Sequence, residues 1–178
     1  ILSRELGIDV STVFCILQTK HNILWLGTYG NGLIKYDIEK HSARLYTQKH
    51  GLPDNVIYGI LEDDESTLWI STNGGLSKFD PRNEEFYNYI ASDGLQSNEF
   101  NLGAYAKTED GGLLFGGPNG FNMFHPTKMT NPYPPKILLS DIKVFGQSIQ
   151  QRKHQHGLKL NHKDTVFSLV FSVLHFKD

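Results

Sequence analysis

The chain has 178 residues and a formal net charge of −2 at pH 7, with acidic and basic residues almost in balance. This balance does not favour binding to nucleic acid or to an anionic membrane surface. The apolar runs are shorter than the roughly 18–20 residues that cross a bilayer, so we expect no direct membrane contact within these residues. The one cysteine, Cys15, cannot form an internal disulfide, and its position predicts a small buried side chain.

A repeat with a period in the low forties dominates the sequence. The segment 24–37 returns at 68–80, and a more divergent copy follows at 113–125. Trp25 and Trp69, which are 44 positions apart, mark the same place in the first two copies. A period of this length, filled with short strands and glycine-rich turns, is typical of one four-stranded blade of a β-propeller. Each blade buries its apolar faces only against its neighbours, so the repeat itself predicts the architecture.

Each of the first two copies predicts four strands. They are expected at 13–18, 23–28, 33–36, 44–47, 56–61, 67–71, 76–79 and 85–90. Trp25 and Trp69 are interpreted as packing between blades, because each can cover a large apolar area. A stacking role on a ligand is the less favoured alternative.

The third copy predicts only three strands, at 102–107, 113–115 and 121–124. A cluster of prolines follows at 132–135, and proline cannot donate a hydrogen bond to a strand ladder. Helices are almost absent, and only 2–6 and 127–131 could hold a single helical turn. We therefore expect a partial propeller of about three blades, the last of them three-stranded.

The end of the chain differs from the repeats. Residues 137–145 and 165–176 both predict strands, and the apolar residues of the second lie on both of its faces. This pattern indicates the opening strands of a β-sandwich. The sequence thus predicts an all-β chain, with propeller blades over 1–130 and the truncated start of a sandwich over 131–178.

No catalytic or metal-binding set is evident. Acidic residues gather in turns, as in 62–65, which favours solvated turn chemistry. A glycosidase would need two carboxylates facing each other across a cleft, and the sequence does not exclude that pairing. His154 and His156 could lie on one side of a strand, but their loop offers no third metal ligand. We expect no metal, no cofactor and no enzymatic activity in this chain.

Blade geometry predicts that two groups of turns meet on one face of the ring. The connections between blades supply Asp54, Asn55, Asn98 and Glu99, and the turns between second and third strands supply Tyr29, Asn31, Asn73 and Asn119. Amides, carboxylates and an aromatic ring suit sugar hydroxyls, because each hydroxyl both donates and accepts a hydrogen bond. The alternative, which we favour, is that the asparagines stabilise tight turns rather than contact a ligand.

Three motifs in order carry a resemblance to a known family. The segments 51–56, 60–63 and 68–76 resemble the two-component regulator propeller repeat. The segment 94–101, followed by 115–120, is similar to that family's final blade, and 131–137 resembles the entry to the immunoglobulin-like domain that follows the propeller. The resemblance implies a periplasmic sensor domain joined through the inner membrane to a histidine kinase or, in other members, to a diguanylate cyclase. It also implies an oligosaccharide ligand and self-association of the parent receptor.

Three classes of function stay open at this point. A sensor domain is favoured by the repeat and by the amide-rich turns. A propeller scaffold for protein contacts would carry apolar residues in those turns, and a carbohydrate-active enzyme would carry paired acids there.

Overall fold

The computed structural model describes residues 12–20, 22–128, 136–148, 153–154, 157–158 and 165–174. The chain divides into two compact units, Ile1–Thr130 and Asn131–Asp178, which are described separately. In both units the described residues form strands and short turns, apart from three single-turn 3₁₀ helices. The expected all-β fold class is confirmed, and no described helix is long and apolar enough to cross a bilayer.

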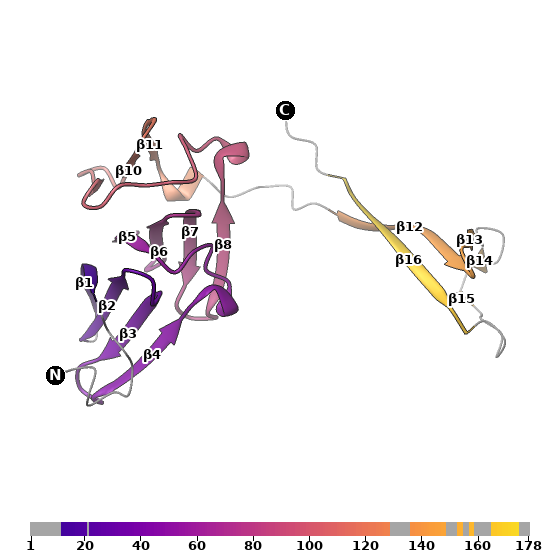
Figure 1. Ribbon diagram of the computed structural model, residues 1–178, viewed down its shortest axis with the longest axis horizontal. Coiled ribbons are helices and arrows are strands. Elements are labelled where there is room, and N and C mark those ends of the chain that lie inside the picture. Colours follow the sequence, from indigo (N-terminus) through magenta and orange to yellow (C-terminus); the bar gives the residue numbers. More distant parts are fainter. Residues whose placement is uncertain are drawn as a thin grey trace. The chain divides into compact units, whose positions relative to one another are not determined.

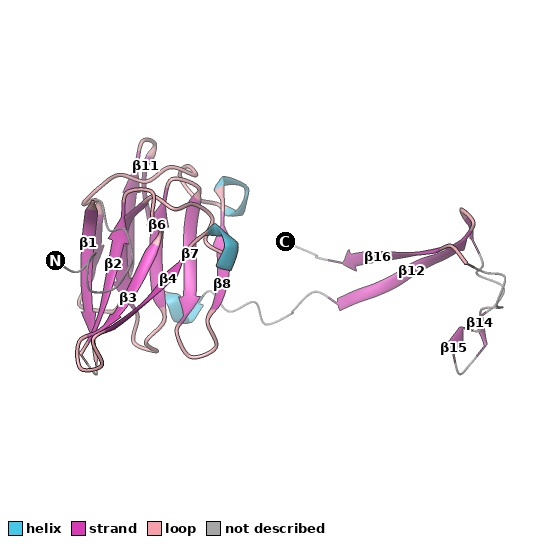
Figure 2. Cartoon of the chain, turned by 60° about the horizontal axis from the view of Figure 1, so that its bottom comes forward, coloured by secondary structure: helices cyan, strands magenta, loops and turns pink. Residues whose placement is uncertain are grey.

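The first unit contains two four-stranded antiparallel sheets with the same strand order (Figures 1 and 2). Blade 1 consists of β1 (Val13–Thr19), β2 (Ile23–Thr28), β3 (Leu33–Asp37) and β4 (Ser42–Tyr46). Blade 2 consists of β5 (Ile57–Glu62), β6 (Leu68–Thr72), β7 (Gly75–Asp80) and β8 (Glu85–Tyr89). Every one of these strands was predicted from the sequence, with ends that agree to within two residues.

Blade 3 has three strands, β9 (Tyr105–Lys107), β10 (Leu113–Gly117) and β11 (Gly120–Phe124). Its first strand was expected to begin at Leu102, but a turn occupies that stretch. Gly103 adopts a φ of 76°, and Ala104 N donates to Asn101 O at 3.2 Å. A left-handed residue cannot continue a strand, so β9 is shorter than its counterparts in the other blades.

The sequence analysis missed two of the three 3₁₀ helices. These are η1 (Gln48–His50) and η2 (Ala91–Asp93), which follow the outer strands of blades 1 and 2. Each ends at a glycine in the left-handed region, Gly51 or Gly94, with φ of 113° and 101°. The third, η3 (Pro126–Lys128), coincides with the start of the helical turn expected at 127–131, whereas the turn expected at 2–6 lies outside the described residues.

The two tryptophans occupy equivalent buried positions between successive blades, as predicted. Trp25 is 2% exposed, and its ring centroid lies 5.6 Å from that of Phe79 in blade 2. Trp69 is fully buried, and its ring lies 4.7 Å from that of Phe124 in blade 3. Aromatic side chains therefore join each blade to the next.

Asp63 departs from the expectation of a solvated acidic turn. Its carboxylate is buried and accepts hydrogen bonds from the backbone N–H groups of Glu65 and Thr67, both at 2.9 Å. The other carboxylate oxygen accepts a bond from Trp69 Nε1 at 2.9 Å. Because buried polar groups need partners, this carboxylate holds both the turn and the tryptophan ring in place. The neighbouring acids Asp64 and Glu65 are exposed, as expected.

Glycines show where the fourth strand of a blade packs. A Cβ on Gly32 would lie 2.2 Å from Tyr46 O, and one on Gly75 would lie 2.3 Å from Tyr89 O. Gly120, the counterpart in blade 3, has open space at the same position. Among the described residues, β11 therefore has an unpaired outer edge. Two apolar side chains of β11, Phe121 and Met123, are 65% and 52% exposed.

The second unit contains a three-stranded sheet in the order β13-β12-β16. Its strands are β12 (Lys136–Val144), β13 (Gln147–Ser148) and β16 (Phe167–Leu174), and a separate pair is formed by β14 (Lys153–His154) and β15 (Gly157–Leu158). β12 and β16 are antiparallel, with a register shift between Leu139 and Asp141. The sandwich expected over 131–178 stays a prediction.

We expect Trp69→Ala to lower the free energy of unfolding by about 3–5 kcal/mol, because it leaves a large cavity and removes the partner of the buried Asp63 carboxylate. Urea unfolding followed by circular dichroism measures the change. Tyr87→Ala is the control, since Tyr87 lies on β8 and is 57% exposed. Equal stability of Trp69→Ala and the unchanged chain would contradict the packing argument.

We also expect the isolated 178-residue chain to self-associate, because unpaired strand edges and exposed apolar side chains recruit other chains. Light scattering measures the particle mass. Placing charges on the open edge with Phe121→Lys and Met123→Lys together should reduce the association. A monodisperse monomer of the unchanged chain would show that the open edge is not a contact surface.

Candidate functional site

The turns at one end of the blades form a continuous strip, which we call the rim. It consists of residues 29–32, 52–56, 73–74, 95–99 and 118–119, and it contains all eight residues proposed from the sequence as ligand contacts. Backbone hydrogen bonds join the first three of these segments. Gly30 N and Gly32 N donate to Asn55 O at 3.2 and 2.9 Å, and Asn73 N donates to Val56 O at 3.3 Å.

Two of the predicted residues have the same structural role in successive repeats. Asn55 Oδ1 accepts a hydrogen bond from Gln48 N at 2.9 Å, at the start of η1. Asn98 Oδ1 accepts one from Ala91 N at 2.7 Å, at the start of η2. The first N–H groups of a helix lack partners within the helix, and these side chains supply them. For these two positions the geometry supports the turn interpretation.

Other predicted residues also bond within the rim. Asp54 Oδ1 accepts a hydrogen bond from Val56 N at 2.7 Å. Asn119 donates through its backbone N to Gln96 Oε1 at 2.9 Å and through Nδ2 to Gln96 O at 3.2 Å. Asn31 N donates to Thr28 Oγ1 at 3.1 Å. These bonds fix the course of the rim and leave its outward surface to other side chains.

An aromatic cluster of Phe14, Tyr58 and Tyr29 lies beside the rim. The rings of Phe14 and Tyr58 are stacked, with centroids 6.1 Å apart and an interplanar angle of 14°. Tyr29 lies 5.3 Å from Phe14 and is 58% exposed. The Tyr58 hydroxyl donates to Asn73 Oδ1 at 3.4 Å. Of the predicted residues, Tyr29 therefore belongs to this cluster, and Asn73 lies directly beside it.

Backbone irregularities position the two stacked rings. The pairing of β1 with β2 shifts register between Val13 and Cys15, and that of β5 with β6 shifts between Ile57 and Gly59. Phe14 and Tyr58 are the residues skipped by these β-bulges. A bulge turns a side chain away from the regular alternation, and bulges are frequent beside functional sites. Here both bulges turn an aromatic residue toward the rim.

Phe14 and Tyr58 were not predicted from the sequence as site residues. The signal that could have revealed them is their common position in the repeat, where both copies place an aromatic residue 11 positions before the tryptophan. Alternation alone assigns such residues to a core face, and the bulge is visible only in the strand pairing.

Negative charge surrounds the Tyr58 hydroxyl. Burial raises the pKa of this hydroxyl, and the charges of Tyr29, Asp54 and Glu99 raise it further. The phenol is therefore neutral at physiological pH and can donate a hydrogen bond. Together the rim offers flat aromatic surface, an amide and two carboxylates. It suits a ligand with both apolar faces and hydroxyl groups.

Metal binding and nucleophilic catalysis have less support in the described residues. Among the described residues, no group of three or more His, Cys, Asp or Glu is arranged to hold a metal ion. His154 lies in β14, and His156 lies outside the described residues. Burial raises the pKa of the Cys15 thiol to about 12, so this cysteine is protonated and is not a nucleophile at neutral pH.

Two segments match the family model described as "Two component regulator propeller", at residues 7–30 and 51–74. "Histidine kinase P4" from Formosa agariphila is 28% identical over 181 aligned residues, which cover 96% of this chain and 13% of the kinase. Both matched segments contain rim residues, and they correspond to the two blades that carry the aromatic cluster.

Solved structures show the same architecture. The extracellular domain of BT3049 from B. thetaiotaomicron, assigned as a hybrid two component system, is 26% identical with a TM-score of 0.68. The alignment covers 94% of this chain and 24% of that domain. The extracellular domain of BT4673 from the same organism shares the fold at 21% identity and a TM-score of 0.58, over 73% of this chain and 20% of that domain.

We expect Asn55→Ala and Asn98→Ala each to lower the free energy of unfolding by about 1 kcal/mol, because each removes the acceptor for a helix N–H group. Asn73→Ala is the matched control, since its side chain is exposed and accepts only a long bond. Thermal and urea unfolding measure the three changes. A loss in Asn73→Ala as large as in the other two would contradict this division of roles.

The chain is a partial β-propeller followed by a second β unit, and it is similar to the propeller-bearing extracellular domains of hybrid two-component systems, of which it spans about a quarter of the length.

Proposed function

We propose that the chain is part of the periplasmic ligand-sensing domain of a membrane-bound two-component signalling protein, and that the rim binds an oligosaccharide. The observation that carries the proposal is the aromatic cluster of Phe14, Tyr58 and Tyr29 beside an amide and two carboxylates. The flat faces of sugar rings are apolar and pack on aromatic rings, while the sugar hydroxyls bond to amides and carboxylates.

The similarity to a histidine kinase and to extracellular domains of hybrid systems favours a kinase output over a diguanylate cyclase. In this proposal the chain itself performs no catalysis, and its ligand acts by stabilising one arrangement of the parent receptor. Self-association of that receptor and the identity of the second unit as an immunoglobulin-like domain belong to the same proposal.

A binding screen tests the proposal. The chain is mixed with a panel of oligosaccharides and followed by thermal shift, and each hit is then titrated by calorimetry. Binding of at least one oligosaccharide is expected, because a ligand that binds the folded state raises its melting temperature. Absence of binding across neutral and acidic oligosaccharides would count against sugar sensing by these blades.

Two variants locate the binding site. Tyr58→Ala should weaken binding about tenfold, since about 1.4 kcal/mol is lost with the ring. Tyr58→Phe keeps the ring and should retain most of the affinity. Tyr87→Ala removes an exposed tyrosine from the outer strand β8, away from the rim, and should leave the affinity unchanged. Equal losses in Tyr58→Ala and Tyr87→Ala would place the ligand elsewhere.

A further inference from the structure

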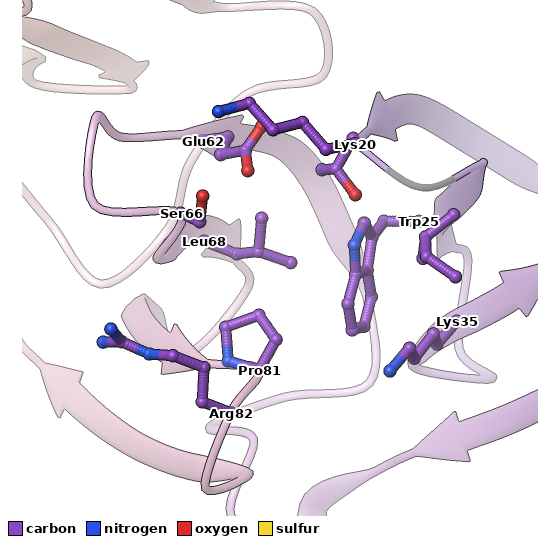
Figure 3. Close-up of a pocket in the computed structure, with 10 residues that line it drawn as sticks. Lys20, Trp25, Lys35, Glu62, Ser66, Leu68, Pro81 and Arg82 are labelled. Atoms are coloured by element: carbon purple, nitrogen blue, oxygen red, sulfur yellow. The ribbon is translucent and has the colours of Figure 1, made fainter.

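A cavity of about 230 Å³ lies in the seam between blades 1 and 2, and we call it the seam pocket (Figure 3). Its lining includes Ile23, at the start of β2, whereas the rim begins at Tyr29, just beyond the end of β2. Since a strand rises about 3.3 Å per residue, the pocket and the rim are about 20 Å apart along β2. The two sites are therefore separate.

The pocket exists because the residue beside the tryptophan ring differs between the two repeats. In blade 2, Trp69 Nε1 donates to the buried carboxylate of Asp63. The strand pairings place Thr19 of blade 1 at the position of Asp63. Thr19 follows the residue that pairs with Leu24, just as Asp63 follows the residue that pairs with Leu68. Threonine is shorter and carries no charge, so the space that Asp63 fills in one repeat is left open in the other.

The surroundings of the Trp25 indole N–H consequently differ from those of Trp69. The side chain is 2% exposed, and among the described residues no acceptor takes the place that Asp63 Oδ2 has beside Trp69 Nε1. Figure 3 shows the indole nitrogen on the edge of the ring that faces Glu62 and Leu68, on the pocket side. Among the described residues no fully buried side-chain nitrogen or oxygen lacks a partner, so this N–H is open to the water of the pocket, which a bound acceptor would replace.

The charges around the pocket are mainly positive. Lys20, Lys35 and Arg82 line it, against the single carboxylate of Glu62. Lys35 Nζ lies 5.6 Å from the centre of the Trp25 ring, where the cation is held over the indole face. Arg82 is already paired with Asp80 through Nε and Nη2, at 2.8 and 2.7 Å. The two lysines, the indole N–H and the hydroxyls of Thr19 and Ser66 are thus the donors available to an anion.

We propose that the seam pocket binds a small hydroxylated carboxylate, of which a uronic acid monosaccharide is the type. The carboxylate of the ligand accepts hydrogen bonds from Trp25 Nε1 and the lysine ammonium groups, and the hydroxyls of the ligand donate hydrogen bonds to Glu62. Leu68, Pro81 and Ile23 supply the apolar wall against which the carbon skeleton packs. The volume is below the roughly 300–1,000 Å³ of pockets for larger ligands, which fits a single sugar unit.

The test uses the two tryptophans as reporters. The 178-residue chain is labelled with 5-fluorotryptophan and gives two ¹⁹F signals, which Trp25→Phe assigns. Titration with glucuronate should shift the Trp25 signal and leave that of Trp69 in place. Glucose, which lacks the charge, should shift neither.

Lys35 and Lys78 offer a matched pair of variants. Lys78 Nζ lies 5.6 Å from the centre of the Trp69 ring, in the same place in its repeat as Lys35, but it does not line the pocket. Lys35→Gln should weaken glucuronate binding about fivefold or more, and Lys78→Gln should leave it unchanged. Thr19→Asp restores the carboxylate of the other repeat and should abolish binding, because it occupies the indole N–H and repels the anion.

Each outcome decides the proposal. A shift of the Trp25 signal that is lost in Lys35→Gln and Thr19→Asp, with both variants folded by circular dichroism, supports it. Equal shifts with glucose and glucuronate would overturn recognition of the carboxylate. Equal weakening of glucuronate binding in Lys35→Gln and Lys78→Gln would show that the affinity depends on the net charge of the chain and not on the pocket, and would overturn the proposal. No shift at saturating glucuronate would show that the pocket does not bind this class of ligand.

Discussion

The packing of aromatic side chains between successive blades is the interaction on which the rest of this structure depends. A four-stranded blade is too thin to bury its own apolar faces, so it becomes stable only against a neighbour. Trp25 meets Phe79 across the first seam, and Trp69 meets Phe124 across the second. Because these contacts join equivalent positions, they set the blades in register. The turns at the two ends of the strands then have fixed neighbours.

One consequence of that register is the rim. Phe14 and Tyr58 come from the innermost strands of different blades, yet their rings are stacked. This requires that both strands carry a bulge at the same level and that the seam between them is closed. Close approach in the seam depends on small residues, since a Cβ on Gly27 would lie 2.6 Å from Ile57 Cγ2. The proposed ligand surface is therefore a product of inter-blade packing rather than of any single turn.

The second consequence is that a difference between two repeats leaves a cavity in the seam. Asp63 completes the hydrogen bonding of Trp69 and closes the space beside it. Blade 1 keeps the tryptophan and the lysine over its face but has Thr19 where the carboxylate would be. The seam then contains a pocket lined by the Trp25 indole and by more cationic than anionic side chains. A difference between otherwise similar repeats is thus a place to look for binding sites in proteins of this architecture.

Much of this molecule could be predicted from its sequence. The spacing of Trp25 and Trp69, the glycine-rich turns and the proline cluster predict two four-stranded blades and a three-stranded one, because strand length and turn chemistry are local properties. Burial of both tryptophans follows from their size. The tertiary structure alone revealed the stacking of Phe14 on Tyr58, the buried state of Asp63 and the capping roles of Asn55 and Asn98. Each of these depends on strand register or on contacts between distant residues, which alternation of apolar and polar residues does not encode.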